Sequence, residues 1–151
     1  TEDQKQVEQY CQLAGYTWEW KKDGGLRVSR KGRVSALHPE TGEPIWFNHA
    51  TFFHVSTFDE KVRRALLQIY SPEDLPNNTY YGDGTPIEEE TLEMLRAAYK
   101  EETVKFAWRQ GDVLLLDNLM TAHAREPFTG ARKVLVGMSE ATNWDELPEV
   151  S

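Results

Sequence analysis

A strand-like stretch at residues 108–138 constrains the fold of this chain more than any other segment. It reads WRQGDVLLLDNLMTAHAREPFTGARKVLVGM. The apolar run at 113–116 follows the turn formers Gly111 and Asp112, and this pattern predicts a strand that is buried on both faces. Asp117 and Asn118 end the run with side chains that can bond the nearby backbone.

Two side chains with binding chemistry follow this predicted strand. His123 comes first, and Arg132 comes nine residues later (132 − 123 = 9), directly before the β-rich run VLVGM. An imidazole and a guanidinium on neighbouring strands can together hold a metal ion and a carboxylate. The segment therefore predicts a pocket that both residues enter.

These residues resemble the C-terminal motif of iron(II)/2-oxoglutarate dioxygenases of the taurine dioxygenase type. The likeness is greatest to the branch of clavaminate synthase and the syringomycin-pathway hydroxylases. A second segment, HPETGEPIWFNHATFFH at 38–54, resembles a strand–turn–strand of the same family, and the likeness covers about residues 10–138. It implies that His123 is the distal iron ligand and that Arg132 binds the C5 carboxylate of 2-oxoglutarate.

The resemblance also implies a domain larger than this chain. The iron of the family needs a His-x-Asp or His-x-Glu pair besides the distal histidine, and in the family that pair lies upstream. We therefore expect residues 1–151 to be the C-terminal portion of a dioxygenase domain, without the upstream half. The implied fold is mainly β with α insertions, a partial double-stranded β-helix (jelly roll) of the clavaminate synthase type. Half a roll leaves sheet edges open, so we expect pairing with the upstream half or self-association.

The implied activity is that of an oxidoreductase. Iron(II) and 2-oxoglutarate would together hydroxylate a small molecule, such as a free or carrier-tethered amino acid, and the isolated chain is expected to be incomplete for catalysis. Candidate residues on the substrate side are Asn48, Phe52 and Arg125.

Other functions remain open. His38 and Glu40 form an H-x-E triplet 85 positions before His123 (123 − 38 = 85), which would suit a compact jelly-roll metalloprotein using these three ligands. The competing interpretation makes residues 39–42 a β-turn between two strands, which the resemblance places away from the metal. A non-catalytic β-sandwich remnant is a further alternative. So is a carbohydrate- or partner-binding module in which His123 and Arg132 only contact a ligand.

Composition narrows the classes of partner and the location. The chain has 25 acidic and 17 basic residues, a net charge of −8, which disfavours nucleic acid because phosphates need clustered Lys and Arg. The single cysteine, Cys11, excludes an internal disulfide, fits a reducing cytoplasmic compartment and is expected to pack as a small apolar residue. No apolar run has the length of a transmembrane helix, so we expect no membrane partner.

The remaining pattern predicts alternating short elements. We expect a helix over 1–14 that Gly15 stops, a turn at 23–25, a helix over 56–70, and a helix that starts with Thr85 as N-cap and Pro86 at its first position. Strands are expected at 26–30, 34–37 and 45–48, and then through Met138. Residues 71–84 are expected to be a loop, and 139–151 a loosely specified acidic tail.

Overall fold

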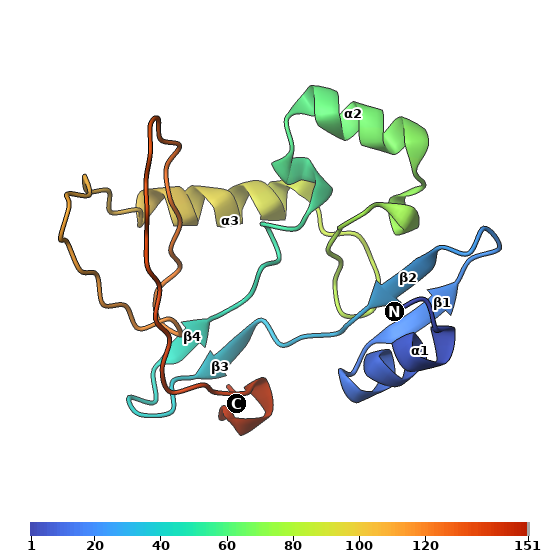
Figure 1. Ribbon diagram of the computed structural model, residues 1–151, viewed down its shortest axis with the longest axis horizontal. Helices are drawn as coiled ribbons and strands as arrows, with labels where there is room; N and C mark the ends of the chain where they lie inside the picture. Colours follow the sequence, from blue (N-terminus) through green and yellow to red (C-terminus); the bar gives the residue numbers. More distant parts are fainter. Residues whose placement is uncertain (151) are drawn as a thin grey trace. The chain divides into compact units, whose positions relative to one another are not determined.

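The computed structural model describes residues 1–150, and Figure 1 shows its helices and strands. The chain divides into two compact units. The first unit comprises residues 1–32 and 49–103, and the second comprises 33–48 and the chain from Val104 onward. The second unit is therefore built from two segments that the first unit separates in sequence.

The first unit opens with helix α1, Gln4–Leu13, as expected. Asp3 caps its first turn, because its carboxylate accepts the N–H of Lys5 at 2.9 Å. Gly15 ends it at a φ of 71°, with its N–H bonded to the Gln12 carbonyl, and the N–H of the next residue reaches back to the Cys11 carbonyl. Cys11 is 3% exposed, which confirms the prediction that it packs as an apolar residue.

An antiparallel hairpin follows α1 and packs against it. Strands β1, Thr17–Trp20, and β2, Leu26–Ser29, pair in the register Thr17↔Ser29 to Trp20↔Leu26. The turn predicted at 23–25 is confirmed, with Gly24 at a φ of 85°. The indole N–H of Trp20 donates to the Glu8 carboxylate at 2.8 Å and ties the hairpin to the helix.

Both later helices of this unit begin after the positions that the sequence predicted. Helix α2, Glu60–Ile69, starts only after Asp59, its N-cap, whose carboxylate accepts two backbone N–H groups. A short 3-10 turn, Val55–Thr57, precedes it. Helix α3, Glu89–Glu101, starts four residues after Thr85, so the expected Thr85 cap is wrong. Thr85 instead bonds Asp83 and accepts the N–H of Tyr81, which holds this stretch in a turn.

The second unit contains the hairpin of β3, Ser35–Leu37, and β4, Pro44–Trp46. The turn predicted between them is confirmed: the N–H of His38 donates to the Glu43 carbonyl at 2.8 Å, and that of Gly42 returns to the His38 carbonyl at 2.9 Å. Ala36, Ile45 and Leu147 form the core of the unit, at 0%, 3% and 5% exposure.

The C-terminal segment is anchored on this hairpin, so the expectation of a loosely specified tail is wrong. A 3-10 turn, Trp144–Glu146, precedes Leu147. The Arg33 guanidinium donates to the carbonyls of Leu147, at 3.2 Å, and Trp144, and the N–H of Leu37 donates to the Pro148 carbonyl at 2.9 Å. Neighbours distant in sequence thus order a segment that looked irregular.

The strands expected between Val104 and Met138 are not formed in the described chain; Figure 1 draws this stretch without an arrow. The turn expected at Gly111 and Asp112 is found, closed by the Arg109 N–H on the Asp112 carboxylate at 2.7 Å. Val113 and Leu115 are 93% and 94% exposed. A strand requires a neighbour for its backbone hydrogen bonds, and no described segment pairs with this one.

Three helices therefore contribute more residues than the four strands, which form two separate two-stranded sheets. Within residues 1–150, no helix combines the length and the apolar character that crossing a membrane would require.

Candidate functional site

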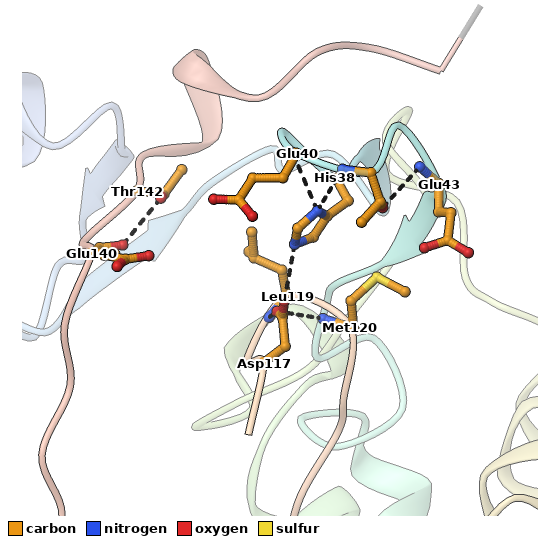
Figure 2. A network of polar contacts seen from close by, with 9 residues as sticks. His38, Glu40, Glu43, Asp117, Leu119, Met120, Glu140 and Thr142 are labelled. Atoms are coloured by element: carbon orange, nitrogen blue, oxygen red, sulfur yellow. Dashed lines mark hydrogen bonds and ion pairs between the residues drawn. The ribbon is translucent and has the colours of Figure 1, made fainter. Parts of the chain in front are cut away.

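His38, an alternative metal ligand, lies directly after β3 and is 6% exposed. Figure 2 shows its ring between two turns. The Nδ1 atom accepts the backbone N–H groups of Glu40 and Thr41, at 3.3 and 3.2 Å. The Nε2 atom lies 3.0 Å from a carboxylate oxygen of Asp117. Both ring nitrogens therefore have partners within the protein.

Asp117 ends the apolar run and organises the turn that follows it. Its Oδ1 accepts the N–H groups of Leu119 and Met120, at 2.9 and 3.2 Å, as predicted for a residue that bonds the nearby backbone. Burial acts to raise the pKa of Asp117, but these two donors and the His38 ring outweigh it and hold the pKa below its ordinary value. The carboxylate is therefore held in its charged form.

His123 lies in an exposed segment six residues after Asp117 (123 − 117 = 6). Its Nδ1 faces the carbonyl oxygen of Thr121 at 3.4 Å, a long contact that suits a proton on Nδ1. That tautomer leaves the lone pair of Nε2 for a metal ion, and metal-bound histidines commonly give their other N–H to a carbonyl. The prediction that His123 projects from a strand is wrong, because no strand forms there.

Arg132 also lies outside any strand, and its guanidinium sits 5.1 Å from the centre of the Phe128 ring. No acidic side chain of the described chain forms an ion pair with it, so a carboxylate ligand would meet no internal competitor. Glu126, the acidic residue directly after Arg125, forms an ion pair with Lys105.

The other two substrate-side candidates have local contacts. Asn48 follows β4, and its amide donates to the Val34 carbonyl at 3.0 Å, joining the two ends of the hairpin. Phe52 belongs to the first unit, is 66% exposed and stacks edge-on against Phe53 with ring centres 5.1 Å apart.

An iron centre of this family type needs three protein ligands on one face. Across residues 1–150, no three His, Cys, Asp or Glu side chains lie close enough together to hold a metal ion. His38, Glu40 and His123 are consequently not assembled into the compact site, and Glu40 is exposed in the turn. The exposed imidazole of His123 is a chemically suitable iron ligand, but it could supply only one of the three protein ligands that such a centre needs.

Sequence reasoning missed two polar clusters. One is the contact of His38 with Asp117, which joins positions 79 apart and leaves no local signal. The other lies in the first unit, where the Ser56 hydroxyl bonds His54 Nδ1 at 2.7 Å and accepts from Arg96 at 2.5 Å. Burial, followed by the charges of Arg96 and Arg63, lowers the pKa of His54.

Comparison with known proteins identifies relatives over most of the chain. The chain is 36% identical over 138 residues to the Dapdiamide synthesis protein DdaC of Enterobacter agglomerans, and the match covers 91% of this chain and 42% of that protein. It is 28% identical over 140 residues to the Clavaminate synthase-like protein At3g21360 of Arabidopsis thaliana, covering 91% and 39%. The chain thus spans about two fifths of the length of these curated relatives. No solved structure matches it.

The family model described as Taurine catabolism dioxygenase TauD, TfdA family matches residues 2–139. This match includes both segments that carried the resemblance in the sequence, at 38–54 and 108–138. The chain belongs to the TauD/TfdA family of dioxygenases.

Proposed function

We propose that this chain is part of an iron(II)/2-oxoglutarate-dependent oxygenase, in which His123 is one iron ligand and Arg132 holds the distal carboxylate of 2-oxoglutarate. Membership of the TauD/TfdA family supports the class of activity. The observation that carries the residue assignment is the availability of both groups: the described residues occupy neither His123 Nε2 nor the Arg132 guanidinium with a polar partner.

Each residue has a defined task in this proposal. Iron(II) with 2-oxoglutarate supplies oxidative decarboxylation of the cosubstrate coupled to hydroxylation of a C–H bond. His123 would offer the lone pair of Nε2 to the metal, while a proton on Nδ1 would be donated to the Thr121 carbonyl. Arg132 offers two parallel N–H donors to a carboxylate, a geometry that lysine does not reproduce.

The proposed fold of the complete domain is the jelly roll of the family. The apolar segments at 113–116 and 134–138 would become strands when the remainder of the domain provides their neighbours. The exposure of Val113, Leu115 and Met138 supports this proposal. Each is more than 90% exposed, and a complete enzyme domain would be expected to bury such apolar side chains. Pairing between two copies of the chain is the competing outcome, and light scattering after size exclusion separates the two. A stable, monodisperse monomer of the isolated chain would count against open edges altogether.

The proposed substrate is a small molecule, a free or carrier-tethered amino acid. The name of the Enterobacter agglomerans relative assigns that protein to dapdiamide synthesis, which supports small-molecule chemistry. Asn48, Phe52 and Arg125 stay proposed substrate-side residues; the exposure of Phe52 and the absence of an ion pair at Arg125 within residues 1–150 are compatible with that role.

Anaerobic titration with iron(II) and 2-oxoglutarate tests the proposal, since the bound pair has a visible charge-transfer band. We expect little or no band from the isolated chain and a clear band from the complete family domain containing it. In that domain, His123→Ala should abolish the band. Arg132→Lys should weaken 2-oxoglutarate binding roughly 10- to 100-fold, the loss of one charge-assisted hydrogen bond. Lys133→Ala, beside Arg132, is the matched control and should change little.

A non-catalytic β-module is the second candidate, favoured by the finding that no three-ligand group exists among residues 1–150. It predicts that the complete domain gives no band at any iron concentration. A strong band from the isolated chain would instead contradict the proposed dependence on further ligands.

A further inference from the structure

His38 and Asp117 connect two turns of the second unit (Figure 2). The first turn follows β3, and its N–H groups at Glu40 and Thr41 point to His38 Nδ1. The second turn, at 117–121, is closed on Asp117: its carboxylate accepts two N–H groups, and its backbone carbonyl accepts the N–H of Thr121 at 3.0 Å. The contact between His38 Nε2 and Asp117 Oδ2 joins the two turns.

The contacts define the protonation of the His38 ring. Because Nδ1 accepts two backbone N–H groups, the ring proton resides on Nε2 and is donated to the carboxylate of Asp117. The ring is 6% exposed and both of its nitrogens are satisfied, so it has one favourable orientation. The carboxylate in turn uses one oxygen for His38 and the other for its own turn.

A continuous chain of contacts leads from this pair to His123. His38 holds Asp117, the Asp117 carbonyl holds the Thr121 N–H at 3.0 Å, and the Thr121 carbonyl faces His123 Nδ1 at 3.4 Å. A carbonyl oxygen can only accept a hydrogen bond, so the last contact favours the tautomer of His123 with its proton on Nδ1. A displacement of Asp117 would therefore be transmitted to the ring of His123.

We propose that His38 and Asp117 form a positioning pair that fixes the turn preceding His123 and, through Thr121, the orientation and tautomer of the His123 imidazole. The assignment of His123 as a ligand rests on the proposed function. The mechanical link does not need iron, so its test can fail or succeed independently. In this arrangement His38 acts through Asp117 and does not itself bind the metal. Its Nε2 carries the proton donated to Asp117, and the lone pair of Nδ1 is already engaged by the two backbone N–H groups.

Two substitutions of His38 separate the positioning role from simple closure of its own turn. The amide of asparagine lies where Nδ1 lies, so His38→Asn retains an acceptor for the 40–41 N–H groups and loses the donor to Asp117. The amide of glutamine reaches the position of Nε2, so His38→Gln retains that donor and loses the turn acceptor. Asp117→Asn is a third variant: its carbonyl oxygen still accepts from Leu119 and Met120, but its NH₂ group opposes the Nε2 proton.

The measurement is NMR of the isolated chain without metal, combining amide exchange at 119–121, backbone order parameters at 121–123, and the ¹⁵N shifts of the His38 and His123 rings. We expect the wild-type His38 ring to be protonated at Nε2. In His38→Asn and Asp117→Asn, exchange at 119–121 should rise roughly tenfold, the effect of losing one charge-assisted hydrogen bond, and the His123 tautomers should mix. His38→Gln should stay within about twofold of wild type. Glu43→Gln, an exposed change in the same turn, is the control.

Wild-type exchange and order at 119–123 in His38→Asn would overturn the proposal. So would equal loosening in His38→Asn and His38→Gln, because that result assigns His38 to turn closure alone. If a His38 variant fails to fold, Asp117→Asn decides: unchanged order at 121–123 in that variant refutes the link. Loss of the iron band with this link intact would instead contradict the proposed function and leave the positioning pair standing.

Discussion

Arg33 anchors the C-terminal segment on the β3–β4 hairpin, and its removal should release that segment. The guanidinium donates to two backbone carbonyls, at Leu147 and Trp144, and lies 5.4 Å from the centre of the Trp144 ring. Its ion pair with Glu149 spans 3.7 Å, and that carboxylate side chain is 82% exposed, so the pair adds close to nothing in water. The two hydrogen bonds and the stacked ring should therefore dominate.

The magnitude follows from these contacts. A hydrogen bond from a charged donor contributes about 1.5 kcal/mol or more and an exposed cation–π contact about 0.5 kcal/mol, and the side chain of Arg33 is partly exposed. Because the contacts share one side chain and are not additive, we expect Arg33→Ala to lower the free energy of opening the segment by about 2 kcal/mol, roughly 30-fold in its equilibrium. Arg33→Lys keeps the charge but not the fork and should lose about half of this.

Amide exchange at Leu37 measures the effect directly, since its N–H donates to the Pro148 carbonyl at 2.9 Å. Exchange at this amide should accelerate in Arg33→Ala, with little change at Cys11 in the other unit. Arg30→Ala is the matched control, because Arg30 is exposed and has no ion pair within residues 1–150. Equal Leu37 exchange in the two alanine variants would refute the reasoning, and a large effect of Glu149→Gln would show that the ion pair had been underrated.

Three further changes test the first unit. Leu92 is fully buried on α3, so Leu92→Ala should destabilise this unit by about 2–5 kcal/mol in chemical denaturation, while Leu92→Met should cost less than about 1.5 kcal/mol. Asp59→Ala removes the cap of α2 and should lower stability by about 1 kcal/mol, whereas Asp59→Ser should recover most of it; equal losses in both variants would argue against capping. Burial and the charges of Arg96 and Arg63 lower the pKa of His54 in the folded protein, so the unfolded chain binds more protons at this residue. The free energy of unfolding should therefore fall as pH drops below about 6.5, the ordinary pKa of histidine, toward the lower pKa of the folded state. His54→Gln should flatten this dependence in denaturation measured from pH 7 to 5.

Features with local causes were predictable from the sequence. Gly15 ends α1 through its positive φ, the turn after His38 closes on its own backbone, and Asp117 bonds the N–H groups just after it. Each needs only residues within a few positions, so the residue types alone indicate the conformation. The family resemblance was also confirmed, because it rested on motifs in two segments.

Features with distant causes were not predictable. The apolar run at 113–116 has the composition of a strand, but a strand exists only where a second one pairs with it. Thr85 has the composition of a helix cap, but its bonds to Asp83 and Tyr81 draw it into a turn. The contact between His38 and Asp117 spans 79 positions, and spacing along the chain says nothing about such a pair. The predicted roles of His123 and Arg132 stay predictions until iron and cosubstrate binding are measured.

The second unit is assembled across an excursion of the polypeptide. Residues 49–103 amount to 55 residues (103 − 49 + 1 = 55) between the hairpin and the segment that completes its core. The entropy of closing a flexible loop grows only with the logarithm of its length, so replacing these 55 residues with ten would recover only about 1.5 kcal/mol. Insertions or deletions within residues 49–103 should therefore change the free energy of forming the core of Ala36, Ile45 and Leu147 only slightly. This core can stay the same while the length of the intervening chain varies.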